Sequence, residues 1–356
     1  MNVRADPVAT SLLQRLPHSP DAYPQKLDVV GEQVLLVQFD AALYRTASFL
    51  DDRILSPSTK GAWISLDQAA EAARSVSSDL PLHFIFHTGH VGSTLVSRLL
   101  DDTGEMLSLR EPLPLRTLAD AADALGRPDS LLSEPQFEAL VGMFLRLWRR
   151  GYAGSRGIVL KATSSAGRLA LPLLAAESSR AIYMNLRAEP YLATLLAGQN
   201  SPTDLRGHGP GRMRRLQARV GAKLSPLHAL SLGELAAMSW LAESWSQCDA
   251  LDGSGGRVIS IDFELFLARV EETMGRILDH FALTASGSYL AGVGRSPVLT
   301  RYSKAPEYAY TPGERAQVLN ESRRFNGAEI RKGLQWLEQR ALSDAAVAKL
   351  LDRVGS

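Results

Sequence analysis

The residues best placed to do chemistry lie in one short stretch, residues 89–94, with the sequence GHVGST. Its two glycines permit a tight turn, and either Ser93 or Thr94 can cap a helix. An apolar run precedes the turn at 82–86, and apolar residues recur at helical spacing over 95–100. A strand, a glycine turn and a helix start direct backbone N–H groups and the helix dipole at an anion. The stretch therefore predicts a phosphate site.

Charged residues stand at the ends of three further apolar runs that predict strands: Glu111 after 106–109, Lys161 after 158–160 and Arg187 after 181–186. The carboxyl ends of parallel strands meet at the edge of a sheet where ligands bind. We therefore expect Glu111 within reach of whatever the loop holds; the alternative is a surface pair with Arg110 or Arg116. A guanidinium can bind phosphate through two hydrogen bonds, which makes Arg187 a candidate phosphate ligand.

Alternating strands and helices must hold these residues in place. Strands are expected at 82–86, 106–109, 158–163, 181–186 and 257–263. Helices are expected from about 93, twice within 113–150, from about 190, and at 229–251, 264–281 and 313–339. This alternation predicts an α/β fold of the P-loop type, a doubly wound parallel sheet flanked by helices.

The sequence divides into three expected parts. Residues 1–78 form a mixed N-terminal extension, 79–285 the α/β domain, and 286–356 a C-terminal loop and helix packed on the same domain. In the extension we expect a strand or hairpin around Gly31 and a helix over 66–73. No residues there suggest chemistry, so the extension is interpreted as a packing arm or lid.

Composition excludes several classes of protein. The chain has 356 residues and a net charge of +1. So small a charge does not attract the chain to nucleic acid or to an anionic membrane, and neither is expected as a partner. Its one cysteine, Cys248, lies in an apolar stretch and is expected to be a buried thiol in a reducing compartment. The sequence has neither a long apolar run nor a secretory signal, so we expect a cytoplasmic protein.

The segment 82–100 resembles the 5′-phosphosulfate loop of the sulfotransferase family, whose bacterial members carry a strand followed by P-[RK]-S-G-[ST]-T-L-L. The matching positions are Gly89, His90, Val91, Gly92, Ser93, Thr94, Leu95 and Val96. His90 stands where the family has Arg or Lys, and Val91 stands where it has Ser. The resemblance covers about 82–285 and includes, in order, strand ends that read REP, LK, LR-x-x-P and IDF.

The resemblance implies a sulfotransferase that uses 3′-phosphoadenosine 5′-phosphosulfate (PAPS) and releases 3′,5′-adenosine bisphosphate (PAP), with no metal expected. Residues 89–94 would bind the 5′-phosphosulfate, and Arg187 would bind the 3′-phosphate. The family's serine eight residues after that Arg is absent, and Thr194 is offered in its place. The IDF strand end contains Asp262, which the resemblance makes a structural carboxylate.

The same resemblance assigns the catalytic roles. Glu111 would be the general base that takes the acceptor's proton, with His90 as the alternative base. Lys161 would neutralise charge on the bridging oxygen and partly offset the cation missing at position 90. The alternative without a catalytic role is that Lys161 is a solvated lysine at a strand end.

Basic residues outside these motifs leave open questions. The segment 198–223 carries six Arg or Lys residues and is expected to be a mobile loop that leads into a basic helix. It is either a lid over the anionic ligand or a solvated insertion. Arg301 and Lys304, in an expected loop, could clamp an anion. The triplet 331–333 spells the family's R-K-G motif, but it falls in an expected helix and is interpreted as chance.

Two other functions remain open on the sequence alone. A nucleotide-dependent kinase or phosphoryl transferase would carry G-x-x-x-x-G-K-[ST], and the lysine is absent after Gly92. A non-catalytic nucleotide-binding protein is compatible with the substitutions at His90 and Val91. The acceptor, a small molecule, carbohydrate or peptide with a hydroxyl or amine, is not identified by the sequence. The oligomeric state is also open, a homodimer included.

Overall fold

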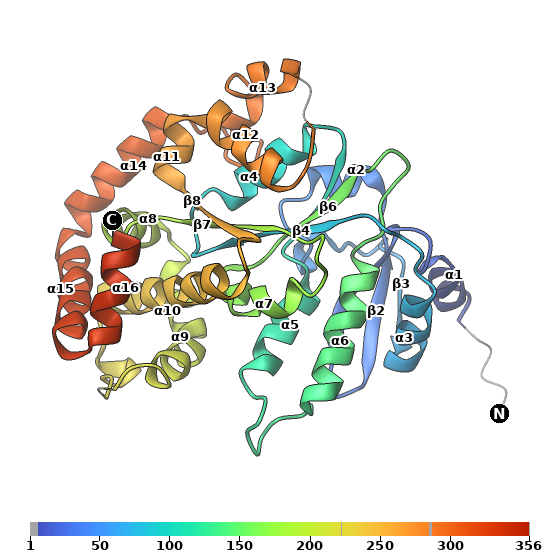
Figure 1. The fold of residues 1–356 in the computed structure, drawn as a ribbon, viewed down its shortest axis with the longest axis horizontal. Coiled ribbons are helices and arrows are strands. Elements are labelled where there is room, and N and C mark those ends of the chain that lie inside the picture. The colour runs from blue at the N-terminus through green and yellow to red at the C-terminus, as the bar shows by residue number, and fades with distance from the viewer. Residues whose placement is uncertain (1–5, 222, 285–286, 356) are drawn as a thin grey trace.

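The computed structural model describes residues 6–221, 223–284 and 287–355. Its centre is a parallel sheet with the strand order β5-β6-β4-β7-β8 (Figure 1). The strands are β4 (Leu82–His87), β5 (Met106–Arg110), β6 (Gly157–Lys161), β7 (Ala181–Asn185) and β8 (Val258–Asp262). All five expected strands are present, and the predicted α/β fold class is confirmed.

The sheet reverses its winding at β4. The chain adds β5 and β6 on one side of this strand and β7 and β8 on the other. A crevice therefore opens beyond the carboxyl end of β4, which is where ligands bind in open α/β sheets. Every residue of β4 is buried, so its position in the sheet is firmly determined.

Helices cover both faces of the sheet. Alternate residues of the strands enter two cores: Phe84 and Phe86 belong to one, and Ile85 belongs to the other. The helices are α1 (Pro7–Arg15), α2 (Ala41–Thr46), α3 (Leu66–Arg74), α4 (Ser93–Asp101), α5 (Leu113–Ala122), α6 (Glu134–Leu147), α7 (Ala170–Leu173), α8 (Ala188–Ala197), α9 (Ser201–Gln217), α10 (Leu232–Gly253), α11 (Phe263–Ala268), α12 (Val270–His280), α13 (Gly287–Val293), α14 (Pro312–Phe325), α15 (Gly327–Ser343) and α16 (Ala345–Gly355).

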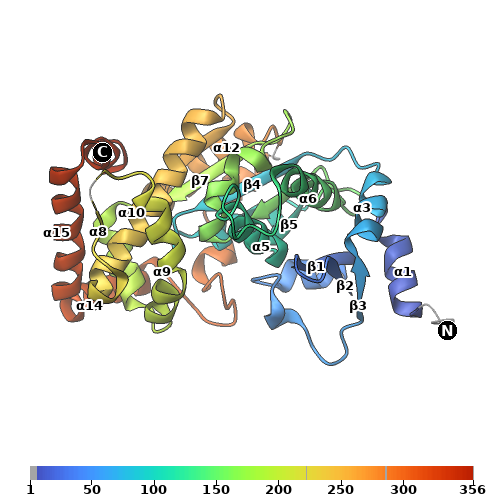
Figure 2. The ribbon, with the colours of Figure 1, turned by 90° about the horizontal axis from the view of Figure 1, so that it is seen from below.

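The N-terminal part forms a small antiparallel sheet of β1 (Ala22–Asp28), β2 (Gln33–Gln38) and β3 (Gly61–Ser65). The expected hairpin around Gly31 is confirmed, and Glu32 has the left-handed φ of 50° that such a turn requires. This sheet and the C-terminal helices lie at opposite ends of the central sheet (Figure 2). Its buried residues join the same core as Phe84, so the extension packs as an integral part of the molecule.

Some helices differ from expectation. The stretch 264–281 contains two helices with a break at Arg269, and 313–339 is divided between α14 and α15 at Asn326. The basic segment 198–223 is mostly helical as α9, despite Pro210 within it. Its helix is held by a buried ion pair in which Arg212 donates to Glu243 on α10 at 3.1 Å. No helix of the described residues is long and apolar enough to cross a membrane.

Candidate functional site

The loop between β4 and α4, residues 89–94, forms a cup lined by backbone amides. Gly89, His90 and Gly92 have left-handed φ values of 110°, 56° and 70°. Gly92 caps α4 without any side-chain hydrogen bond. Among the described residues, no group accepts a hydrogen bond from the amides of 89–94. Free amides in successive left-handed and helical conformations, at a helix N-terminus, make a concave site for an anion.

Packing around the loop explains its glycines. A Cβ on Gly92 would lie 2.1 Å from Cε2 of Phe263, so only glycine fits there. Behind the loop, the Tyr191 hydroxyl donates to the carbonyl of Thr88 at 3.2 Å and also bonds to Ser239 on α10. The cup is therefore held rigidly from two sides before any ligand binds.

The loop forms one wall of a cavity of about 360 Å³. The opposite wall consists of α11, the segment around 299–304 and the first turns of α14. Cations enter the lining at four positions: Lys161, Arg301, Lys304 and Arg315. None of the described residues that line it is Asp or Glu, so the cavity is electrostatically suited to an anion.

Histidines at the cavity are neutral. The buried His87 ring bonds through Nε2 to the carbonyl of Ala162 at 2.8 Å, and burial, helped by Lys161, holds its pKa well below the usual range. His90 lines the cavity, and burial of its imidazole, helped by Lys304, lowers its pKa to about 3. Neither ring thus supplies a positive charge at neutral pH.

Glu111 and Lys161 form a hydrogen-bonded ion pair at the ends of the neighbouring strands β5 and β6. The Lys161 side chain is 1% exposed and that of Glu111 14% exposed. Burial lowers the pKa of Lys161, and the Glu111 carboxylate opposes this effect. Glu111 does not pair with Arg110, which instead binds Asp101. The carboxylate and the ammonium are therefore held together within the crevice of the sheet.

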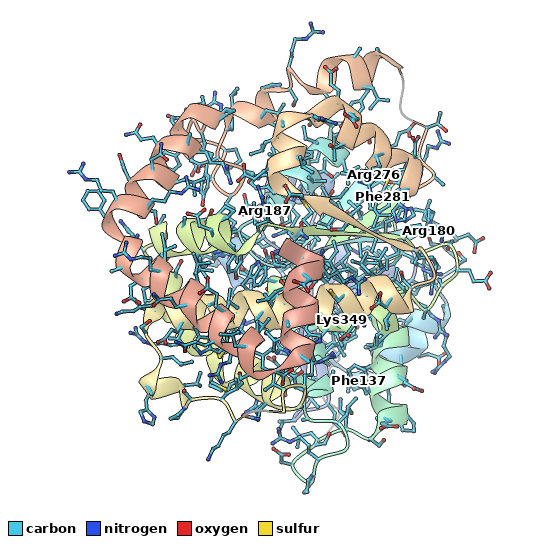
Figure 3. All side chains as sticks on the ribbon, turned by 60° about the vertical axis from the view of Figure 1, so that its left-hand side comes forward. Phe137, Arg180, Arg187, Arg276, Phe281 and Lys349 are labelled. Atoms are coloured by element: carbon cyan, nitrogen blue, oxygen red, sulfur yellow. The ribbon has the colours of Figure 1, made fainter. Side chains whose placement is uncertain are left out.

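The structure brings only some of the predicted site residues into the cavity. The predicted residues that line it are His90, Val91, Gly92, Ser93, Thr94, Lys161 and Thr194. Glu111 contacts Lys161 but does not line the cavity. Gly89, the first loop residue, is also outside the lining, and a Cβ there would lie 3.6 Å from Ser164 and from the Tyr191 hydroxyl. Arg187 is exposed, precedes α8 and is not part of the lining (Figure 3). Thr194 uses its hydroxyl to donate to the carbonyl of Pro190 at 2.7 Å.

One cation of the lining was missed by sequence reasoning. Arg315 binds Glu264 through both carboxylate oxygens and lies over the Phe263 ring, 5.1 Å from its centroid. It lies in α14, over 200 positions after the loop, and no motif marks it. By contrast, Arg331 and Lys332 lie on α15, outside the cavity lining. The described residues contain no cluster of three or more His, Cys, Asp or Glu suited to a metal ion.

No protein-family model matches the sequence, and a search of curated proteins finds no match either. Similar solved structures include the sulfotransferase domain from the curacin biosynthetic pathway, with 13% identity and a TM-score of 0.41 over 74% of this chain and 99% of that chain. Mouse sulfotransferase SULT7A1 complexed with PAP has 11% identity and a TM-score of 0.39 over 82% and 97%. Sulfotransferase STF9 from Mycobacterium avium has 13% identity and a TM-score of 0.36 over 90% and 96%. A function must therefore be argued from the site itself.

Proposed function

We propose that the protein is a sulfotransferase that moves a sulfuryl group from PAPS to a hydroxyl or amine of an acceptor. One observation carries the proposal: a cup of unbonded amides opens into a cavity with four cations and, among its described lining residues, no carboxylate. Such a site suits a ligand with several anionic groups, as a doubly phosphorylated nucleotide has.

The residues present fit the donor. The amides of 90–94 would hold the 5′-phosphosulfate, and the buried Thr94 hydroxyl has no hydrogen-bond partner among the described residues. Arg301, Lys304 and Arg315 would meet the remaining phosphate charge. Arg187, expected at the 3′-phosphate, does not line the cavity, whereas Thr194 does.

The ion pair at the strand ends would supply the catalysis. PAPS, when bound, brings an activated sulfuryl group that leaves from phosphate. Lys161 would stabilise negative charge on the bridging oxygen as that bond breaks. Glu111, in contact with Lys161, would accept the proton of the attacking hydroxyl or amine. His90, neutral at the cavity mouth, is the alternative proton acceptor.

Calorimetry with PAP and with ATP tests the donor assignment, and transfer of labelled sulfate from PAPS to a panel of phenols tests the reaction. We expect PAP to bind and ATP to bind weakly, because no lysine follows Gly92. Tight ATP binding with no PAP binding would instead support a phosphoryl transferase and refute the proposal.

One observation favours a second function, a nucleotide-binding protein without catalysis. The loop position that carries a cation in the sulfotransferase pattern holds His90, which is neutral here. PAP binding without sulfate transfer to any phenol of the panel, in a protein that also fails to hydrolyse PAPS, would support this second function.

A further inference from the structure

Glu111 has an unusual backbone conformation for a residue with a side chain. Its φ is 55°, in the left-handed region that is unfavourable for any residue with a Cβ. Such a conformation persists only where the surrounding structure holds it, and it is most often found at functional sites. Because Glu111 is also the proposed general base, the groups that hold its backbone bear directly on the reaction.

The left-handed turn decides where the Glu111 side chain points. In the register of the sheet Arg110 lies opposite Lys161, so these two side chains share one face. An extended residue at 111 would point to the other face, where Leu109 and Leu160 enter the core. The turn breaks this alternation, and the Glu111 carboxylate meets Lys161 instead. The ion pair therefore depends on the backbone conformation at 111.

One peptide unit, the C=O of Arg110 and the N–H of Glu111, is held from both sides. The Glu111 amide donates to the carbonyl of Lys161 on β6 at 2.7 Å. The amide of Leu50 in the N-terminal part donates to the carbonyl of Arg110, also at 2.7 Å. Pro112 follows directly, and its ring fixes its own φ. The turn is thus restrained before, at and after Glu111.

The Arg110 side chain ties the same N-terminal segment to the sheet. It is 1% exposed, and its Nη1 donates to the carbonyls of Tyr44 and Ala47 at 2.9 and 2.8 Å. Its Nε donates to the Ser97 hydroxyl on α4 at 3.0 Å, and its Nη2 pairs with Asp101. The two carbonyls lie at the C-terminal end of α2, where carbonyls lack partners within the helix and the dipole favours a cation.

A second arginine completes this cap. Arg98 of α4 donates to two more carbonyls at the end of α2 and, at 2.8 Å, to the Ser48 hydroxyl. The ring of Phe49, the next residue, has its centroid 5.4 Å from Nζ of Lys161. Two guanidinium groups therefore fix residues 44–50 beside the ion pair.

We infer that Arg110 is a positioning residue for the proposed reaction. Together with residues 44–50 it holds the peptide unit before Glu111, and so keeps the carboxylate on Lys161, where it can accept the acceptor's proton. Arg110 is not part of the cavity lining, so it acts only through Glu111. The N-terminal part then supports the catalytic pair, although its own sequence suggests no chemistry. This inference rests on the proposed function, because it concerns the base of that reaction.

A double-mutant cycle of Arg110→Met and Glu111→Gln tests the inference. Arg110→Met removes every donor of the guanidinium and keeps an unbranched side chain. We expect kcat for sulfate transfer from PAPS to a phenol to fall about 10- to 100-fold, as for a catalytic group displaced by about 1 Å, with PAP affinity unchanged. In the Glu111→Gln background the same change should lower kcat by no more than about twofold, because the group that Arg110 positions is gone.

Hydrogen exchange gives a readout that does not depend on activity, with Arg150→Met as the matched control. Arg150 is a second buried arginine, 4% exposed, that donates to carbonyls of the N-terminal part. Among the described residues, none of its hydrogen bonds goes to residues 44–50 or to the ion pair. The amides of Leu50 and Glu111 should exchange faster in Arg110→Met than in Arg150→Met, beyond any difference in the free energy of unfolding. Arg150→Met should keep the wild-type kcat.

Should Arg110→Met not fold, Arg110→Lys takes its place in the cycle, because lysine keeps the charge beside Asp101 but lacks the planar group that reaches both carbonyls. An unchanged kcat in Arg110→Met would overturn the inference, as would an equal loss with and without Glu111→Gln. Full transfer in Glu111→Gln would also overturn it. Absence of PAP binding, or PAP binding without sulfate transfer in the wild type, would refute the proposed function and the inference with it.

Discussion

The pair of Glu111 and Lys161 makes each charge depend on the other. Lys161 is fully enclosed by protein, and its burial disfavours the ammonium form. A buried charge that loses its partner typically costs about 3–5 kcal/mol, more than the pair itself contributes. Replacement of either residue should therefore change the electrostatics of the remaining one, and stability must be measured beside activity.

Glu111→Gln keeps the shape of the side chain and removes its negative charge. We expect sulfate transfer to fall by roughly 10²- to 10⁴-fold, the usual contribution of a general base. PAP affinity should change much less than transfer, because Glu111 does not line the cavity and acts on it only through Lys161. Steady-state kinetics and calorimetry check both expectations, with the exposed Glu138→Gln on α6 as control. Unchanged transfer in Glu111→Gln would shift the role of base to His90.

His90→Lys places a fixed charge in the phosphate loop. Since His90 is neutral at pH 7, the new ammonium should tighten PAP binding by about three- to tenfold, despite some strain at a left-handed φ. Calorimetry at pH 7 measures the change, and the exposed His228→Lys serves as control. Weaker PAP binding in His90→Lys would mean that the loop amides do not face the nucleotide.

At the level of single residues, the loop conformation at 89–94 could be predicted because the residues that determine it are neighbours in the sequence. Gly89, Gly92 and Thr94 are marked by their spacing between a strand and a helix. The partner of Glu111 was not predictable in this way. Lys161 is 50 positions away, and it becomes a neighbour only because β5 pairs with β6.

At the level of elements, the loop depends on a helix that follows the last strand. α11 begins at Phe263, whose ring occupies the space that a Cβ on Gly92 would need. The same ring lies beneath Arg315 of α14. The loop 89–94, α11 and α14 therefore form one packed unit around the cavity.

Gly92→Ala should abolish PAP binding and destabilise the fold by about 2 kcal/mol or more, from the left-handed φ and the overlap with Phe263. Gly104→Ala is the matched control. Its φ of 75° is similar, but a Cβ there meets nothing within 4 Å. The control should lose only about 1 kcal/mol and bind PAP normally. Urea unfolding measures the change in stability, and calorimetry measures the change in PAP affinity. Equal losses of stability and of PAP binding in Gly92→Ala and Gly104→Ala would contradict the role of Phe263.

The elements themselves were largely predictable. Each strand of the central sheet is a short apolar run with a charged or turn residue after it, so its end could be located. The break at Arg269 was not predicted, because no proline or glycine marks it in the helical pattern. The break at Asn326 was also not predicted, although Gly327 follows it, because the helical pattern continues on both sides of this Asn-Gly pair. The basic segment 198–223 was expected to be a loop that leads into a basic helix, whereas α9 already begins at Ser201. Its glycines and Pro210 hid the early helix start, and the ion pair with the distant Glu243 that holds the helix has no local mark in the sequence.

At the scale of the whole molecule, titratable groups are buried on both sides of the sheet. His83 on β4 is 1% exposed, stacks on Phe281 of α12 at 4.6 Å, and accepts a hydrogen bond from the amide of Arg180. Burial, with help from His280, lowers the pKa of His83 to about 4. The folded state therefore holds this ring neutral where an unfolded chain would protonate it.

Acidification should consequently destabilise the protein. Between the unfolded pKa near 6.5 and the folded pKa of about 4, the unfolded state binds more protons, so stability falls as pH falls. His83 alone should account for a loss of about 2 kcal/mol from pH 7 to pH 5. Urea unfolding at pH 7 and pH 5 measures this loss of stability. In His83→Asn the loss should be about 2 kcal/mol smaller than in the wild type, whereas a variant at an exposed position, His18→Asn, should lose as much stability as the wild type.

Arg98, on the helix that follows the phosphate loop, joins two distant segments. Its guanidinium donates to the carbonyl of Ser303 and to the hydroxyl of Ser48, both at 2.8 Å. Ser303 lines the cavity, and Ser48 precedes Phe49. Movement of either segment would change the hydrogen bonds of the same guanidinium, so the cavity wall at Ser303 and the N-terminal segment at Ser48 are mechanically coupled. By thermodynamic linkage, a ligand that binds at one segment and alters affinity at the other must be affected to the same degree by binding there.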